Sequence, residues 1–293
     1  EVTSTGNALE NAKKADQTRA NNIASQKTIV AHDTQDKNNQ LIDKIRRGWL
    51  LLNNRQGCNK SNIRLIAHFI KRADKQKEDI RFKELRLKNR KICEALIALR
   101  NSGSKNGKAI VGIDAAASEF DTSPEVFAPV FKRLREKGFQ HFTYHAGEDF
   151  YHLLGGLRAI YEAITFLNLQ RGDRIGHATA AGVDPETWEH NVGDEVVVPI
   201  GAYMDDLLFV YYLISNNECK ALESLMPRLY MRITELSREI FPNDEFQVYD
   251  LIYSWKKRQE DILELADSGE LNNIKALKRY HQKEHVEKYN TQT

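Results

Sequence analysis

Apolar runs alternate with amphipathic segments along the middle of the chain. Residues 62–72 have the β-branched content and the length of a buried strand, and residues 109–114 form a nearly continuous apolar run. Such a run is expected for a strand that is buried on both faces of a sheet. Between them, residues 74–101 carry apolar side chains at helical spacing in their second half, which predicts a long, charged amphipathic helix.

The same alternation continues toward the C-terminus. Ser123 and Pro124 suit the N-cap and first position of a helix, and Gly138 suits its C-terminal end. The pattern predicts helices at 123–138, 153–169 and 184–191 and strands at 141–146, 173–178 and 195–200. Regular alternation of strand and helix favours an α/β fold with a parallel sheet or barrel.

The two ends of the chain differ from this middle part. Residues 1–40 are polar, with few large apolar side chains, and are expected to form a mobile arm or a solvated helix. The part from 41 to 204 holds the predicted sheet. Residues 205–293 are predicted to be helical throughout, as an accessory region for packing or assembly.

Composition narrows the possible partners. The chain has 43 basic and 41 acidic residues, so no overall field indicates nucleic acid or an anionic membrane. Its longest purely apolar run, residues 207–214, is too short to span a bilayer. We therefore expect a cytoplasmic protein with no membrane partner. The three cysteines, Cys58, Cys93 and Cys219, lack metal-site spacing and are expected to be free thiols.

Polar residues cluster where three predicted strands end. Asp114 ends one strand, His145 and Glu148 follow the next, and His177 ends a third. In parallel α/β barrels, reacting groups lie at the carboxyl ends of the strands. One such residue alone is more often a strand cap or a satisfied histidine, but three together favour a site. Histidine and carboxylate side chains suit metal-assisted hydrolysis. Gly147 lets the backbone turn so that Glu148 points back toward the site at the strand ends.

These strand ends carry a family resemblance. The segments "IDAAASE" at 113–119, "HAGE" at 145–148 and "RIGHA" at 174–178 resemble, in order and spacing, the later strands of the adenosine and AMP deaminase family. That family consists of zinc-dependent enzymes of the amidohydrolase superfamily. The resemblance covers roughly residues 60–200 and implies a partial (β/α)8 TIM barrel of the amidohydrolase type, with helical insertions and a helical C-terminal region.

The resemblance implies a role for each matching residue. His145 is similar to a zinc ligand, Glu148 to the acid that protonates purine N1, and His177 to the histidine that orients and activates the zinc-bound water. Ala117 stands where the family usually has a glycine whose backbone N–H meets purine N3. Asp114 belongs to the same substrate-side segment, where a supporting role is expected for it and for Glu119.

The chain also departs from the family pattern. It has no H-x-H, which supplies two zinc ligands in the family. Its one adjacent aspartate pair, Asp205–Asp206, fits the start of a helix better than the family's terminal metal-binding pair. The chain therefore matches only part of the family's zinc site. Either the chain is a segment of a longer enzyme, which the missing initiator Met at Glu1 and the retained Glu148 and His177 favour, or it is a degenerate deaminase-like scaffold.

A narrower resemblance rests on "GIDAAASEF", "HAGEDF", "GGLRAI" and "GDRIGHATA". Together they look like the large adenosine deaminase components of anti-phage defence systems of the RADAR type. This implies Zn²⁺-dependent deamination of an adenosine nucleoside or nucleotide, a large homo-oligomer and a partner ATPase. A catalytically inactive assembly subunit and a different amidohydrolase on the same barrel stay open as alternatives.

Several other patterns are expected to be structural. "HQKEH" at 281–285 matches a zinc-protease pattern but is interpreted as a solvated helix near the chain end, and "GSKNGKA" at 103–109 as a turn. His68 stands alone in the sequence and is interpreted as a surface or core residue. His141 is expected to point inward on the same strand face as His145, one layer deeper.

Overall fold

A computed structural model describes residues 40, 47, 64–75, 79–103, 105–193 and 195–293. Most of the predicted arm, residues 1–39, and Cys58 lie outside this part. Contacts divide the chain into two units. One contains residues 64–93 and 109–293 and includes every strand described below. Among the described residues, 40, 47, 94–103 and 105–108 belong to the other.

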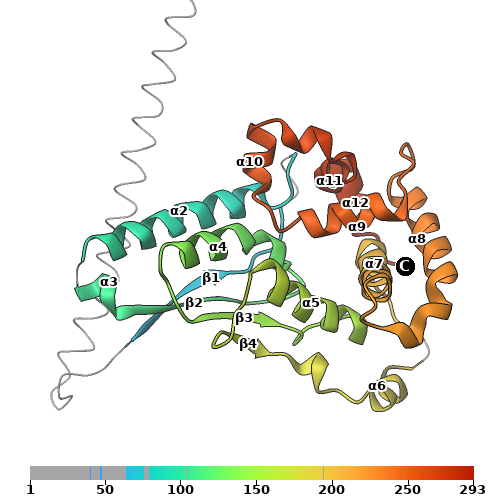
Figure 1. Cartoon of the computed structure of the whole chain (residues 1–293), viewed down its shortest axis with the longest axis horizontal. Coiled ribbons are helices and arrows are strands. Elements are labelled where there is room, and N and C mark those ends of the chain that lie inside the picture. The colour runs from blue at the N-terminus through green and yellow to red at the C-terminus, as the bar shows by residue number, and fades with distance from the viewer. Residues whose placement is uncertain (1–39, 41–46, 48–63, 76–78, 104, 194) are drawn as a thin grey trace, which may run out of the picture. The chain divides into compact units, whose positions relative to one another are not determined.

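A parallel sheet forms the centre of the larger unit. Its strand order is β1-β2-β3-β4, so each strand pairs with the next one along the chain. The connections run through helices, as the alternation predicts. The strands are β1 (Leu65–Ile70), β2 (Ile110–Ala116), β3 (Phe142–Ala146) and β4 (Arg174–His177), and Figure 1 shows them side by side.

One face of this sheet is buried beneath aromatic side chains. Phe131 of α4 (Ala128–Glu136) packs against Phe69, Phe142 and Tyr144, with ring centroids 6.2, 5.4 and 6.1 Å away. All four side chains are almost completely buried. Fully burying such a side chain contributes about 1.5–3 kcal/mol, so this layer anchors the strands. Helix α5 (Leu153–Phe166) also packs against β3.

The alternate positions of β1 face the other way. Ile66 and Ile70 are 54% and 51% exposed, whereas Phe69 between them is fully buried. Parallel sheets are normally covered on both faces. A parallel sheet of this kind, with helices between its strands and an edge strand that is exposed on one side, is compatible with part of an α/β barrel.

The helices before β2 differ in extent from their prediction. Helix α2 spans Lys83–Asn101 and begins later than the predicted residue 74. The Asp74 carboxylate instead accepts a hydrogen bond from the backbone N–H of Phe82, at 2.9 Å, and Phe82 directly precedes the helix. The predicted turn at 103–109 is wrong in its second half, because Lys105–Ala109 form the short helix α3.

Between the strands, η1 (Pro124–Val126) and α4 together occupy the predicted helix at 123–138. Ser123 makes no side-chain cap there. Past β4 lie η2 (Thr179–Ala181) and α6 (Pro185–Val192), whose N-cap Asp184 accepts a hydrogen bond from the N–H of Thr187.

The predicted strand at 195–200 does not form. Pro199 makes an isolated antiparallel bridge to Gln292, and Val198 exchanges backbone hydrogen bonds with Thr293 at 3.2 and 2.9 Å. Proline has no N–H to donate to a sheet. Pro199 instead precedes helix α7, which begins at Ile200, so the β-branched run pairs with the C-terminal residues.

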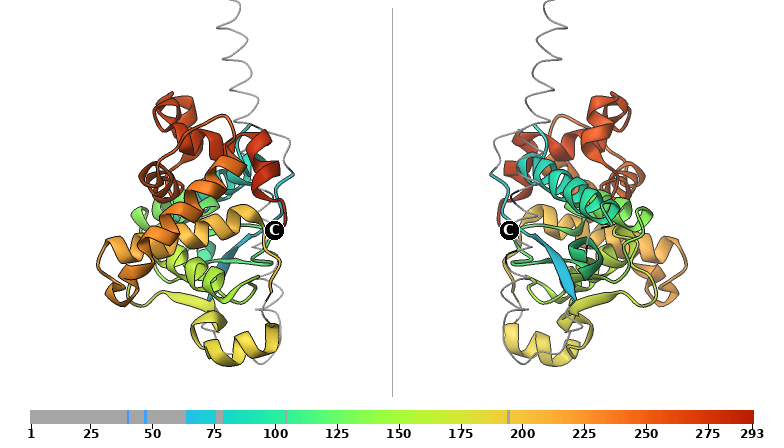
Figure 2. Two further views of the ribbon diagram at one scale, coloured as in Figure 1. Left: turned by 90° about the vertical axis from the view of Figure 1, so that its right-hand side faces the viewer. Right: turned by 90° about the vertical axis from the view of Figure 1, so that its left-hand side faces the viewer.

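The C-terminal part is helical, as predicted, apart from this pairing. Its apolar core extends from Ile200 to Tyr289 and is shared by all the larger helices of the region. Figure 2 shows these helices from two further sides. None of the helices in the described ranges is long and apolar enough to cross a membrane. The elements are α7 (Ile200–Ser215), η3 (Lys220–Leu225), α8 (Met226–Ile240), α9 (Val248–Lys257), α10 (Ile262–Asp267), η4 (Glu270–Asn273), α11 (Lys275–His281) and α12 (Lys283–Tyr289).

Candidate active site

Three of the predicted site residues meet where β3 and β4 end. The rings of His145 and His177 have centroids 5.4 Å apart. The Nδ1 of His177 lies 3.3 Å from Oε1 of Glu148, and both side chains are about half exposed. The parallel register, in which Ala146 pairs with His177, brings them together. Their roles stay predictions, but two imidazoles and a carboxylate here can move protons.

Two glycines make room for this arrangement. Gly147 has φ +77°, a left-handed conformation, and a Cβ there would lie 2.6 Å from Cδ1 of Ile160. Gly176 lies on β4 beside His145, where a Cβ would come within 2.5 Å of the imidazole ring. The chain therefore needs glycine at both positions to turn after β3 and to hold the His145 ring.

Glu119 fixes the loop that carries Glu148. Its carboxylate accepts hydrogen bonds from the backbone N–H groups of Gly147, at 2.7 Å, and Glu148, at 3.3 Å. Burial raises the pKa of Glu119, although the charge of Lys71 and these two hydrogen bonds oppose the rise. This placement fits the supporting role expected of Glu119.

Asp114 lies on β2 between two histidines. Its Oδ1 is 3.2 Å from Nδ1 of His145, and its Oδ2 is 3.1 Å from Nδ1 of His68 on β1. His68 is a surface residue, as interpreted from the sequence, but it is not isolated: the sheet register places it directly beside Asp114. Nothing local in the sequence marks it, because the pairing of β1 with β2 is a tertiary property.

Ala117 adopts a backbone conformation that favours glycine. Its φ is +99°, and the residue is exposed just past the end of β2. Such a conformation costs a non-glycine residue about 1–3 kcal/mol. Ala117 thus has a backbone conformation that glycine adopts more readily, and its predicted contact with a substrate stays a prediction.

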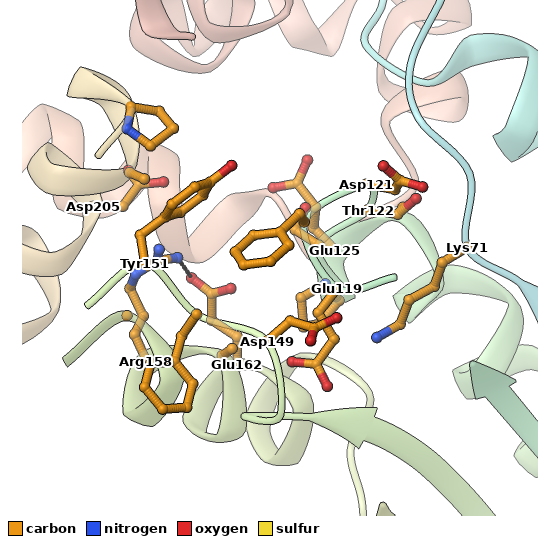
Figure 3. A pocket seen from close by; sticks show the side chains of 18 of the residues that line it. Lys71, Glu119, Asp121, Thr122, Glu125, Asp149, Tyr151, Arg158, Glu162 and Asp205 are labelled. Carbon is orange, nitrogen blue, oxygen red and sulfur yellow. Dashed lines mark hydrogen bonds and ion pairs between the residues drawn. The ribbon is translucent and has the colours of Figure 1, made fainter. Parts of the chain in front are cut away.

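A cavity of about 400 Å³ opens beside these strand ends. Figure 3 shows Lys71, Glu119 and Asp149 near one another, with Arg158, Glu162 and Asp205 around another part of its wall. His145 belongs to the lining, whereas Glu148 and His177 do not. The candidate site therefore lies at the edge of the cavity.

Lys71 is a buried residue of this wall that the sequence did not indicate. Its Nζ donates a hydrogen bond to the backbone carbonyl of His145 at 2.6 Å and lies 4.5 Å from the ring centroid of Tyr144. Burial lowers the pKa of Lys71 to about 8, although the nearby charges of Glu119 and Asp114 oppose the shift. Lys71 thus supports the strand end at His145.

The pair Asp205–Asp206 is engaged in buried ion pairs. Arg258 contacts both oxygens of Asp205, at 2.6 and 2.9 Å, and the hydroxyl of Tyr289 also bonds to this carboxylate. Arg158 Nε lies 2.7 Å from Asp206 Oδ1. Burial opposes the ionisation of Asp205, but Arg258 outweighs it and lowers the pKa. The pair lies within α7, not at its start, and its contacts with Arg158 and Tyr289 link α7 to α5 and α12.

Two histidine interpretations are wrong. His281 and His285 are buried, and they belong to different helices, α11 and α12, because the chain turns at Gln282. Pairing of the C-terminal residues with Val198 keeps this end folded against the core. His141 is exposed and precedes β3, with φ +63°, so the strand alternation does not reach it.

The described residues do not form a complete zinc site. Across these ranges, no three His, Cys, Asp or Glu side chains are grouped so that they could hold a metal ion. Stable zinc sites use at least three protein ligands. His145 alone does not fit the ion.

Comparison with known proteins gives a partial similarity. Over 91 residues the chain is 37% identical to a protein named adenosine deaminase from Clostridium kluyveri, a match that covers 31% of this chain and 24% of that relative. The chain thus matches well under two thirds of the relative's length. No family model matches the chain. The similarity relates about a third of this chain to a quarter of a protein with that name.

We predict that Glu119→Ala loosens the Glu148 loop. The buried N–H of Gly147 loses its acceptor, which costs about 1–3 kcal/mol of unfolding free energy. Amide exchange at 147 and 148 should accelerate, whereas Glu119→Gln, which keeps an acceptor oxygen, should show a smaller change. Exposed Glu239→Ala is the control. Exchange equal to that of the unchanged chain in Glu119→Ala would contradict this role.

We predict that Lys71 makes stability depend on pH between about 8 and 10.5. In that window the unfolded chain still binds the proton that the folded chain has released, so the free energy of unfolding rises with pH. Below pH 8 both states are protonated, and this contribution is constant. Urea titrations of Lys71→Met should lack the rise; an identical pH slope in both proteins would show that Lys71 titrates normally.

Proposed function

We propose that the chain supplies the strand-end part of the active site of an adenosine-deaminase-like hydrolase. Its reaction is the replacement of the purine 6-amino group of an adenosine nucleoside or nucleotide by water, which gives an inosine product and ammonia. The observation that carries the proposal is the meeting of His145, Glu148 and His177 on neighbouring strands, with 3.3 Å between Glu148 and His177.

In this proposal each residue has one task. Glu148, in its protonated form, gives a proton to purine N1, which makes C6 more electrophilic. His177 orients the water that attacks C6, takes up one proton from it and passes that proton to the departing amino group, which leaves as ammonia. The remaining proton of the C6 hydroxyl returns to Glu148 as the carbonyl of the inosine product forms. The distance between Glu148 and His177 supports this division, because the acid and the base must reach adjacent atoms of one ring.

Zinc dependence is a further part of the proposal. A bound zinc ion would make a water molecule more acidic. Since the described residues supply His145 alone, we propose that the remaining ligands come from outside the described part of the chain. The steps assigned to Glu148 and His177 do not depend on where those ligands lie.

The wider role is proposed from the sequence resemblance. We propose an anti-phage function, a large homo-oligomer and a partner ATPase. The C-terminal helices offer a surface for assembly, since Met231, Tyr249 and Tyr253 are exposed there. Exposed large apolar side chains on packed helices are a common feature of protein interfaces.

A catalytically inactive scaffold is the second candidate, favoured by the absence of a complete metal group among the described residues. Metal analysis separates the two. The protein expressed from its complete gene should contain zinc in near-stoichiometric amount if it is an enzyme, whereas a metal-free protein that still forms its oligomer supports the scaffold.

We predict that Glu148→Gln lowers kcat by about 10²–10⁴-fold, because the amide cannot donate the proton. The protein from the complete gene would be assayed with adenosine and with adenosine nucleotides by the change in purine absorbance. Exposed Glu189→Gln on α6 is the matched control. Unchanged turnover in Glu148→Gln would refute the assigned role.

A further inference from the structure

We propose that His68 is a positioning residue of this site. Acting through Asp114, it holds the His145 ring in the tautomer that carries its proton on Nδ1, so that Nε2 is left with a free lone pair. The inference rests on the proposed function only in giving His145 a part in it, and its test needs no enzymatic activity.

The tautomer of His145 follows from what surrounds Nδ1. Two oxygen acceptors face this nitrogen: Oδ1 of Asp114 at 3.2 Å and the backbone carbonyl of Ala115 at 3.3 Å. A neutral imidazole has one N–H and one acceptor nitrogen. Two acceptors on one side require the N–H there, which leaves Nε2 as the acceptor that a metal ion or a water molecule can use.

Asp114 in turn depends on donors from side chains. Its side chain is 6% exposed, so water satisfies little of the carboxylate. A buried carboxylate is costly unless it is hydrogen-bonded. His145 serves Oδ1 and His68, at 3.1 Å, serves Oδ2, so the carboxylate bridges two imidazoles. Lys71 adds a nearby positive charge, but its ammonium group bonds to the backbone of His145 instead.

The sheet places His68 for this task. His68 on β1 pairs in register with Asp114 on β2, and both side chains extend to the same side. His68 is 53% exposed, which is more than a packing role requires. Its removal therefore deletes little buried contact but takes away the donor to Oδ2. The carboxylate is then free to turn, and the preference for a proton on Nδ1 of His145 weakens.

The test is nuclear magnetic resonance of the full chain labelled with ¹⁵N at histidine. At a pH where the rings are neutral, long-range ¹H–¹⁵N correlations distinguish the two tautomers, and His145→Gln identifies the signal. We expect the Nδ1–H form in the unchanged chain. In His68→Ala the Nε2–H fraction should rise several-fold.

Matched variants separate the donor from the side chain's bulk. His68→Asn places an amide N–H near the position of Nδ1 and should restore the original tautomer, whereas exposed His190→Ala should change nothing. Buried His281 and His285 report whether each variant is folded, and His68→Val, a good strand former, replaces the alanine variant if that one unfolds. The inference is overturned if His145 carries its proton on Nε2 in the unchanged chain, or if it keeps the Nδ1–H tautomer in His68→Ala. It is also overturned if the Nε2–H fraction of His145 is the same in His68→Asn as in His68→Ala.

Discussion

The parallel pairing of β2, β3 and β4 is the constraint on which the candidate site depends. Residues that end neighbouring parallel strands come to one edge of the sheet, so Asp114, His145 and His177 meet although they are far apart in sequence. The aromatic layer around Phe131 holds the strands from one side. His68 and Asp114 lie on the opposite side of the sheet, where His68 on β1 is exposed and Asp114 on β2 is buried.

The segment around the end of β2 supports the proposed reacting residues at the end of the neighbouring strand, β3. Asp114 contacts the His145 ring, and Glu119 accepts hydrogen bonds from the loop that carries Glu148. Both are carboxylates that bind N–H groups, and neither is placed to react with a substrate in the proposed mechanism. Lys71 adds a third support through the carbonyl of His145. Geometry at this site is thus set by side chains from two adjoining strands.

Sequence patterns predicted the parts of this arrangement that are encoded locally. A β-branched run indicated β1, a nearly continuous apolar run indicated β2, and the alternation of strands with helices indicated β3 and β4. The rule that reacting groups lie at strand ends indicated His145, Glu148 and His177. The roles of His68 and Lys71 were not predicted, because a single residue carries no periodic signal and the partners of both residues depend on strand register. The strand predicted at 195–200 was wrong because Pro199 and the C-terminal residues decide how this run pairs. The solvated helix predicted for "HQKEH" was wrong because tertiary packing buries residues whose polar pattern, taken alone, indicates exposure to solvent.

The central claim is that Glu148 and His177 act together on one purine. A double-mutant cycle on kcat/KM for an adenosine substrate, with Glu148→Gln, His177→Asn and both changes in the protein from the complete gene, tests it most directly. Residues that act as a unit are non-additive. We predict that the double variant is about as impaired as the worse single variant. Effects that multiply would show that the two residues act independently and would contradict the account.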